Sequence, residues 1–498
     1  MKNRSSFCKV STGMLIFALS TPALLVGCSS PQPKTEGAVY DTGKVAEYAT
    51  PYVSYDANYN TEEYNAIDES NFKAVATSPL STFAADVDTA SYANIRRFIN
   101  SGELPPADAV RIEEMLNYFH YDYPQPNEGE PFSVTTEISA CPWNPDTKLM
   151  MVGMQAKQVD ELEKKPSNLV FLIDVSGSMD SPDKLPLVKN AFLLLCDQLK
   201  ENDTISIVTY AGSDQVVLEG AKGSDSKEIM TAIEDLEAGG STAGSEGIKT
   251  AYEIARKYFK ADGNNRVILA TDGDLNVGIT SEGELTRLIK KEKESGVFLS
   301  VLGFGTENIK DNKMEALADN GNGNYSYIDS RFEAKKVLSE ELGANFFTVA
   351  KDVKFQLEFN PKFIKGYRLI GYENRIMDDE DFKDDTKDGG EIGSGHRVTV
   401  LYEIVDKDSP MDIGSDLKYQ SSAVTESNDL LNIAVRYKEP DSETSKELNY
   451  PVTTEAIKTE MSDNMKFASA VAETGMLLRD SEFKGKSSYC LLYTSDAA

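Results

Sequence analysis

Between residues 166 and 347, apolar runs of strand length alternate with segments whose apolar residues have helical spacing. This alternation predicts an α/β domain, because successive parallel strands need a crossover, usually a helix, to connect them. The strands should be buried on both faces, since helices cover both sides of such a sheet. The expected strands are Leu169–Ile173, Thr204–Tyr210, Val267–Thr271, Val297–Gly303 and Tyr325–Ile328, and the expected helices are Leu185–Lys200, Lys227–Leu236, Ser245–Lys260, Glu282–Ser295, Lys313–Asn320 and Phe332–Asn345.

The first expected strand ends in an Asp-x-Ser-x-Ser motif, formed by Asp174, Ser176 and Ser178. One carboxylate and two hydroxyls offer oxygen ligands, which suit Mg²⁺, Mn²⁺ or Ca²⁺ rather than Zn²⁺. The carboxyl end of a strand in an open α/β sheet is also where these folds bind ligands. The alternative is a helix N-cap, in which such side chains accept hydrogen bonds from free helix N–H groups. Two later residues favour the metal, because Thr242 lies on a loop between expected helices and Asp272 follows the strand at 267–271.

The combination of these five residues resembles the metal-ion-dependent adhesion site of the von Willebrand factor type A family. The resemblance implies that Ser176, Ser178 and Thr242 bind the metal directly, while Asp174 and Asp272 act through water. It also implies an antiparallel edge strand near residues 216–218 and a doubly wound, mostly parallel sheet. Neutral hydroxyl ligands leave Mg²⁺ electron-poor, so that an open position can take a carboxylate from a partner. Asp274 is expected to be a solvated turn carboxylate, with a second cation as the alternative.

Strand-like segments occur on both sides of the α/β region. We expect them to form one β-sandwich into which the α/β domain is inserted, because insertion is tolerated where the ends of the inserted domain lie close together. The N-terminal part, residues 80–165, should contain helices and then strands, and residues 348–489 should be β-rich and end in a helix. Leu104–Tyr118, Pro142–Pro145 and Gly393–His396 resemble a bacterial envelope lipoprotein subfamily with a type A centre. The acidic run 378–388 is expected to be a loop of solvated charge rather than a calcium site.

The N-terminal residues 1–27 are predicted to be a lipoprotein signal peptide. Three basic side chains precede an apolar run that is too short to span a membrane. The sequence Leu25-Val26-Gly27-Cys28 resembles a bacterial lipobox, in which Cys28 is lipidated and anchors the chain without spanning the bilayer. A non-lipidated signal peptide is the alternative. Serine after the cysteine indicates, by resemblance to proteobacterial sorting, the outer membrane of a Gram-negative bacterium. Residues 28–79 are predicted to be a disordered tether.

The composition limits the partners. A formal charge of −30 argues against nucleic acid as a partner, because phosphate contacts need Lys and Arg.

Cys196 falls among leucines in an expected helix and should be a buried small hydrophobe, so a disulfide with Cys141 is disfavoured. Residues 490–498 resemble translated transposon-adapter sequence, and we expect them to be a non-native tail and the natural protein to continue past residue 489.

The sequence offers little support for an enzyme. The two histidines, His120 and His396, are far apart, and no nucleophile–base pair or phosphate loop is evident. We therefore expect a membrane-anchored protein-binding module of the cell envelope, in which bound Mg²⁺ captures an Asp or Glu of a partner protein. The alternative is an assembly scaffold of an envelope complex with a structural metal, and a metal-dependent hydrolase is less favoured.

Overall fold

The computed structural model describes residues 61–85, 88–159, 165–240, 245–273, 282–306, 308–342, 344, 347–414 and 426–494. All of them lie in one compact unit, residues 58–498. The predicted signal peptide, Cys28, Thr242 and Asp274 lie outside the described residues. Within the described ranges, no helix combines the length and the apolar character needed to cross a membrane.

The α/β domain contains a six-stranded sheet in the order β10-β9-β8-β5-β6-β7. Its described strands run parallel except β7, which is the expected edge strand. The predicted fold class is therefore confirmed. The strands are β5 (Ser167–Asp174), β6 (Thr204–Tyr210), β7 (Asp214–Lys222), β8 (Asn264–Thr271), β9 (Phe298–Phe304) and β10 (Tyr325–Ile328), and the helices are α3 (Leu185–Cys196), α4 (Ser226–Glu234), α5 (Ser245–Lys257), α6 (Glu282–Lys293), α7 (Asp311–Asn320) and α8 (Arg331–Lys335).

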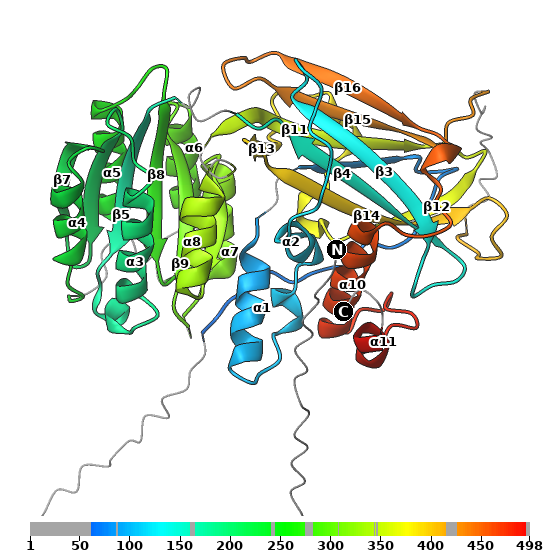
Figure 1. Ribbon diagram of the computed structural model, residues 1–498, viewed down its shortest axis with the longest axis horizontal. Helices are drawn as coiled ribbons and strands as arrows, with labels where there is room; N and C mark the ends of the chain where they lie inside the picture. The colour runs from blue at the N-terminus through cyan, green and yellow to red at the C-terminus, as the bar shows by residue number, and fades with distance from the viewer. Residues whose placement is uncertain are drawn as a thin grey trace, which may run out of the picture. The chain divides into compact units, whose positions relative to one another are not determined.

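Helices cover both faces of this sheet (Figure 1). All eight residues of β5 are buried, and they alternate between the two faces because successive strand side chains point to opposite sides. Phe171 and Ile173 pack with α3, α4 and α8, whereas Val170 and Leu172 pack with α5 and α7. The last helix is shorter than predicted, since α8 passes into a π-helical turn at Lys336–Glu340 before the chain leaves the domain.

Two antiparallel sheets form the sandwich. One has the order β1-β12-β14-β4-β3, and the other has the order β13-β11-β15-β16 with β2 paired to β11. Large apolar side chains such as Phe83, Met150 and Phe355 fill the space between the sheets. The strands are β1 (Lys73–Ala74), β2 (Leu80–Ala84), β3 (Phe132–Ala140), β4 (Lys148–Ala156), β11 (Thr348–Phe359), β12 (Ile364–Ile370), β13 (Gly390–Gly393), β14 (Arg397–Asp406), β15 (Leu431–Lys438) and β16 (Ser445–Val452).

The α/β domain is inserted into this sandwich, as predicted. Strand β4 precedes the domain and β14 follows it, yet the two strands pair from Arg397 opposite Gln155 to Ile404 opposite Lys148. The sandwich core therefore needs both flanking parts of the chain.

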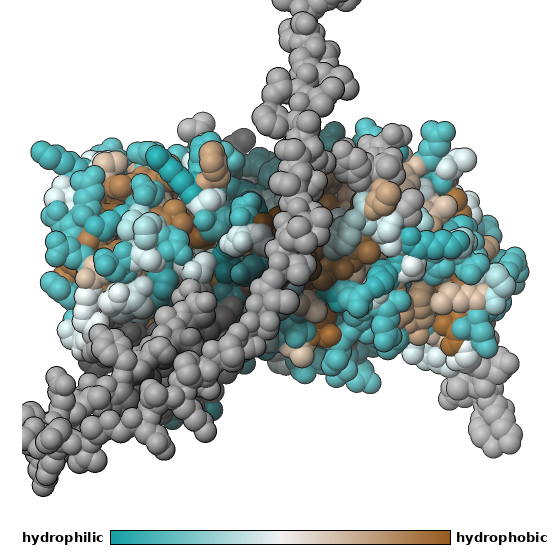
Figure 2. Space-filling model, turned by 90° about the horizontal axis from the view of Figure 1, so that it is seen from below, coloured by the Kyte–Doolittle hydropathy of each residue, from teal (hydrophilic) through white to brown (hydrophobic). Residues whose placement is uncertain are grey.

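Helices cover the outer face of the first sheet. Side chains of α2 and α10, among them Ile112 and Met465, pack against Leu149 and Leu401 of that sheet. The described helices outside the α/β domain are α1 (Ala90–Asn100), α2 (Ile112–Asn117), α10 (Asp463–Leu478) and α11 (Tyr489–Thr494). The face in Figure 2 is largely hydrophilic where it is not grey, with apolar residues in separate areas.

Part of the predicted tether is folded. Residues 61–79 belong to the described structure, and β1 within them pairs with β12. The Glu63 N–H group donates to the Ile309 carbonyl at 2.9 Å, and the Glu69 carboxylate pairs with Arg479 at 2.6 Å. The prediction of disorder is therefore wrong for residues 61–79. The polar side chains of this segment form hydrogen bonds and ion pairs with the rest of the folded chain.

The cysteines agree with the prediction. Cys141 and Cys196 are both buried free thiols, and Cys196 packs in the core as the last residue of α3. Cys490, at the start of α11, is exposed. The origin of residues 490–498 stays a prediction.

Candidate metal centre

The candidate site lies where the direction of strand addition reverses. Strand β5 has β6 on one side and β8 on the other, although β6 and β8 are separated in sequence. Loops that leave neighbouring strands at such a point diverge and open a crevice at the carboxyl edge of the sheet. Asp174 is the last residue of β5, and Asp272 directly follows β8. The fold therefore brings these two predicted residues to one edge.

The loop after β5 presents its hydroxyls together. The Ser176 N–H group donates to Asp174 Oδ1 at 2.9 Å, which turns the chain back over the strand end. The hydroxyl oxygens of Ser176 and Ser178 lie 2.9 Å apart. Two of the three hydroxyls predicted as direct ligands are thus adjacent, and they lie beside the predicted water-mediated carboxylate.

A second loop approaches this one closely. The Gly239 N–H group donates to the Val175 carbonyl at 2.8 Å, and the Gly177 N–H group donates to the Gly240 carbonyl at 3.2 Å. Gly240 has a φ of +83°, a conformation that glycine adopts without strain. Thr242 follows two residues later and lies outside the described residues, so its predicted role stays a prediction.

Both carboxylates of the site are buried. Asp174 is 0% exposed and Asp272 is 1% exposed. Burial raises the pKa of Asp174 to about 6, and the charge of Asp272 acts in the same direction, while the hydrogen bonds from Ser176 oppose the shift. Burial, with the charge of Asp174 adding to it, also raises the pKa of the neighbouring Tyr210 hydroxyl. Two buried carboxylates that repel each other favour a cation between or beside them.

Lys184 supplies part of that positive charge. Its Nζ donates to Asp272 Oδ2 at 2.9 Å, and its side chain is only 11% exposed. The sequence analysis missed this residue, because a lysine at the start of an expected helix carries no signal of its distant partner. Thr271 was also missed, and its Oγ1 donates to Asp174 Oδ2 at 3.4 Å.

The donor set fits a hard divalent cation. Two hydroxyl oxygens and two buried carboxylates at one sheet edge are the oxygen ligands that Mg²⁺ and Ca²⁺ prefer. Burial raises the pKa of Asp174, and a bound cation would favour the charged form of this carboxylate. The residues present are therefore compatible with the predicted metal.

A second group of carboxylates lies in the sandwich. Oxygen atoms of Asp352, Asp388 and Glu391 come within 4.8 Å of one another. Lysines already balance two of them, because Lys438 pairs with Asp352 at 2.7 Å and Lys293 pairs with Asp388 at 2.5 Å. The end of the acidic run 378–388 is therefore tied to the protein by ion pairs, and this cluster needs no metal to be stable.

Comparison with known proteins yields three family models. The model described as von Willebrand factor type A domain matches residues 168–341, and the model described as von Willebrand factor matches residues 58–151. A third, described as uncharacterized protein YfbK, C-terminal, matches residues 344–497. The first of these matches contains the four described residues of the candidate site.

Among curated proteins, the chain is 42% identical over 468 residues to uncharacterized protein YfbK of Escherichia coli (strain K12), covering 91% of this chain and 80% of that protein. It is 32% identical over 188 residues to uncharacterized protein sll0103 of Synechocystis, covering 37% of this chain and 43% of that protein. A solved structure, von Willebrand factor type A from Catenulispora acidiphila, is 18% identical with a TM-score of 0.40, covering 70% of this chain and 81% of that one.

Proposed function

Since the chain belongs to the von Willebrand factor type A family as a relative of the bacterial protein YfbK, we propose that it is a membrane-anchored, metal-dependent protein-binding module. The observation that supports this most is the pair of Ser176 and Ser178 hydroxyls, 2.9 Å apart, beside the buried carboxylate of Asp174. This arrangement offers oxygen ligands for Mg²⁺ at the edge of the sheet, with Mn²⁺ and Ca²⁺ as alternatives.

Each residue of the site has a distinct role in this proposal. Ser176 and Ser178 would hold the metal through their hydroxyls, with Thr242 as the third hydroxyl by family resemblance. Asp174 and Asp272 would hold water molecules around it and supply the negative charge. The Ser176 N–H group, which donates to Asp174, keeps that carboxylate oriented. When bound, the metal supplies a Lewis-acid position for an Asp or Glu of the partner.

The charge of the chain is a further reason to expect this binding to depend on the metal. A protein with a formal charge of −30 repels an acidic partner at long range. A partner carboxylate can be captured only where local positive charge outweighs that repulsion. Metal and partner should therefore strengthen each other's binding, because the two equilibria are linked.

We further propose that the protein acts by binding rather than by catalysis, at the outer membrane of a Gram-negative bacterium with Cys28 as its lipid anchor. Replacing Cys28 with Ser should move the protein from the membrane fraction to the soluble fraction of its host. A Cys28→Ser variant that stays in the membrane fraction after a high-salt wash would contradict the anchor without touching the metal proposal.

The metal-dependent partner can be sought by co-purification from the native envelope in Mg²⁺. Wild-type protein should retain the partner. The variants Asp174→Asn and Asp272→Asn and an EDTA wash should each lower the amount of co-purified partner at least about tenfold. Asp197→Asn is the matched control, because Asp197 is an exposed aspartate of the same domain. All variants should melt at similar temperatures.

Retention of the partner under all these conditions would favour the second function, an assembly scaffold that binds through the sandwich. The buried and half-buried ion pairs between the α/β domain and its surroundings favour that alternative, since they hold the domain in place. Arg111 pairs with Asp311 at 2.7 Å, and Arg375 pairs with Asp319 at 2.5 Å.

A further inference from the structure

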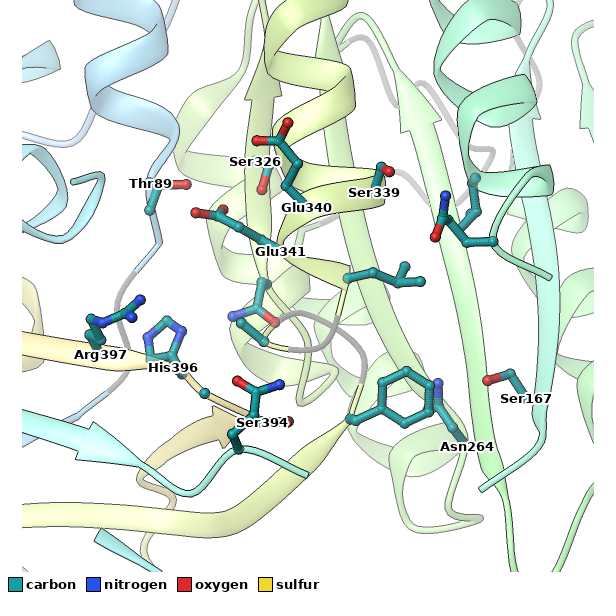
Figure 3. Close-up of a pocket in the computed structure, with 18 of the residues that line it drawn as sticks. Thr89, Ser167, Asn264, Ser326, Ser339, Glu340, Glu341, Ser394, His396 and Arg397 are labelled. Atoms are coloured by element: carbon teal, nitrogen blue, oxygen red, sulfur yellow. The ribbon is translucent and has the colours of Figure 1, made fainter. Parts of the chain in front are cut away.

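A cavity of about 350 Å³ lies at the opposite edge of the parallel sheet from the metal centre. Ser167 and Asn264, the first residues of β5 and β8, line one end of it. His396 and Arg397, at the start of β14, line the other end, as Figure 3 shows. The cavity therefore lies where the α/β domain meets the sandwich, and its volume suits a small molecule.

The turn that carries these residues is tied to both connections of the α/β domain. Ser394 donates its N–H to the Phe347 carbonyl at 2.8 Å and accepts from the Val159 N–H at its Oγ, also at 2.8 Å. A Cβ on Gly393 would lie 1.8 Å from the Ala344 carbonyl oxygen, and Gly395 has a φ of +73°. The turn Gly393–His396 is thus closely packed against its neighbours, and it positions the side chains of His396 and Arg397.

Three polar side chains around the cavity lack partners. The guanidinium of Arg397 makes no hydrogen bond or ion pair within the described structure, and its Nε is buried. His396 Nε2 and Asn264 Nδ2 are likewise buried without a partner. Buried polar groups in native proteins are almost always hydrogen-bonded, so three such atoms around one cavity indicate a missing polar ligand.

The acidic side chains around the cavity do not fill this role, because they are already paired. Glu341 pairs with Lys336 at 3.0 Å, Glu340 pairs with Lys335 at 2.6 Å, Asp88 pairs with Arg375 at 3.1 Å, and Asp203 accepts the Ser167 N–H at 2.7 Å. Burial, with the positive charges of Arg397, Lys336 and His120 adding to it, lowers the pKa of His396 to about 4. The imidazole is therefore neutral at pH 7, and the charged groups that act on it are positive.

We propose that this cavity binds a small oxyanion, a carboxylate or phosphate group, through the guanidinium of Arg397 and the imidazole of His396. A planar guanidinium can donate two parallel hydrogen bonds to such a group, and a neutral imidazole with its proton on Nε2 can donate a third. Asn264 offers a further donor to the remainder of the ligand. This site is separate from the metal centre and does not depend on the function proposed for it.

Imidazole nitrogen signals can locate this binding, because the chain has only two histidines, His120 and His396. Full-length protein, labelled with ¹⁵N-histidine and purified in detergent through a histidine-free tag, is titrated with inorganic phosphate or succinate at constant ionic strength. A His120→Gln variant assigns the signals. One of the two anions should shift the His396 signals in a saturable way, and glycerol should not. Phosphate or succinate acting alone would identify the group that binds.

Calorimetry with the same anion then tests the arginine. Arg397→Gln should weaken binding by at least about tenfold, since it removes the charge and the paired donors. Arg287→Gln, which changes an exposed arginine on α6, should bind like wild type. The proposal is overturned if neither anion gives a saturable shift of His396 in wild-type protein, a result that does not depend on whether Arg397→Gln folds. It is equally overturned if folded Arg397→Gln binds as tightly as wild type.

Discussion

Lys184 decides how much positive charge the metal centre has before a cation arrives. Its ammonium contacts Asp272, and its stem lies against Gly305, where a Cβ would come within 2.3 Å of Lys184 Cε. The side chain is thus held in the site by packing as well as by charge. An ammonium beside a predicted ligand competes with the cation, because the two positive charges repel each other.

Lys184→Met should therefore raise the affinity for Mg²⁺, by on the order of tenfold. The methionine keeps most of the apolar stem, so the packing against Gly305 is largely preserved. Calorimetric titration with Mg²⁺ measures the change, and Lys189→Met, on the helix α3 that follows Lys184, is the control. An unchanged or weaker affinity in Lys184→Met would show that the lysine supports the site rather than competing for it.

Glu113 is a buried carboxyl group that is expensive to ionise. Burial, with the charges of Glu373 and Glu114 adding to it, raises the pKa of Glu113 to about 8 from its ordinary value of 4.5, and its Oε2 has no hydrogen-bond partner among the described residues. The unfolded chain therefore releases this proton at a lower pH than the folded chain does. The stabilising contribution is fully present below about pH 4.5 and is lost as the pH rises to about 8.

Glu113→Gln should remove this loss of stability at rising pH, because the amide of glutamine stays neutral at every pH. Between about pH 5 and pH 8, the free energy of unfolding should fall less in the variant than in wild type, by on the order of a few kcal/mol. Urea unfolding at the two pH values measures the difference. Glu103→Gln, at an exposed position, should keep the wild-type slope, and an equal slope in Glu113→Gln would contradict the argument.

At the scale of elements, the segment 61–74 links parts of the fold that are distant in sequence. Glu63 bonds to the loop at Ile309 and Lys310, and that loop contacts Gly273 of the metal centre, where a Cβ would come within 2.6 Å of the Lys310 nitrogen. Further along the segment, Glu69 pairs with Arg479, which is only 7% exposed. The segment behaves as a structural strap, although its composition predicts a flexible tether.

Removal of the first part of this strap should destabilise the fold. A chain that begins at residue 70 should unfold at a lower temperature than one that begins at residue 61, with a loss of about 1–3 kcal/mol, because buried Arg479 loses one of its two carboxylate partners. Calorimetry of both chains measures this. Equal unfolding temperatures would restore the tether prediction for residues 61–69.

The strands and helices of the α/β domain were predictable within a few residues, with the closing helix as the exception. Strand β6 matches the expected range of 204–210, and β5 and β8 extend theirs only by residues at their ends. These elements follow from contiguous apolar periodicity, which is a local property of the chain. The pairing of β4 with β14 was not predictable in register, since the two strands are separated by the whole inserted domain.

At the scale of the whole molecule, buried ion pairs join the α/β domain to the rest of the described chain. Arg111, which is 4% exposed, contacts Glu114 beside it and Asp311 and Glu315 of α7. Arg96 pairs with Asp329 at 2.6 Å. Because the charge of Arg111 is held out of water, it needs its carboxylate partners, and the joined parts should unfold together.

Arg111→Met should therefore be strongly destabilising, by about 3–5 kcal/mol, since it leaves three carboxylates without their shared cation. Urea unfolding followed by fluorescence should show a lower midpoint than wild type. The exposed Arg331 provides a control as Arg331→Gln, which should change the midpoint little. A small effect of Arg111→Met would show that the domains are joined mainly by other contacts.

The sequence by itself determined the α/β class, the insertion and the positions of Asp174, Ser176, Ser178 and Asp272 at strand ends, because these features depend on local periodicity and on strand-end residues. Only the tertiary structure decided that Lys184 contacts Asp272, that residues 61–79 are folded and that Arg397 faces a cavity with no partner in the described part of the chain. Each of these depends on which distant residues the fold brings together, and a partner tens or hundreds of residues away leaves no trace in the local pattern.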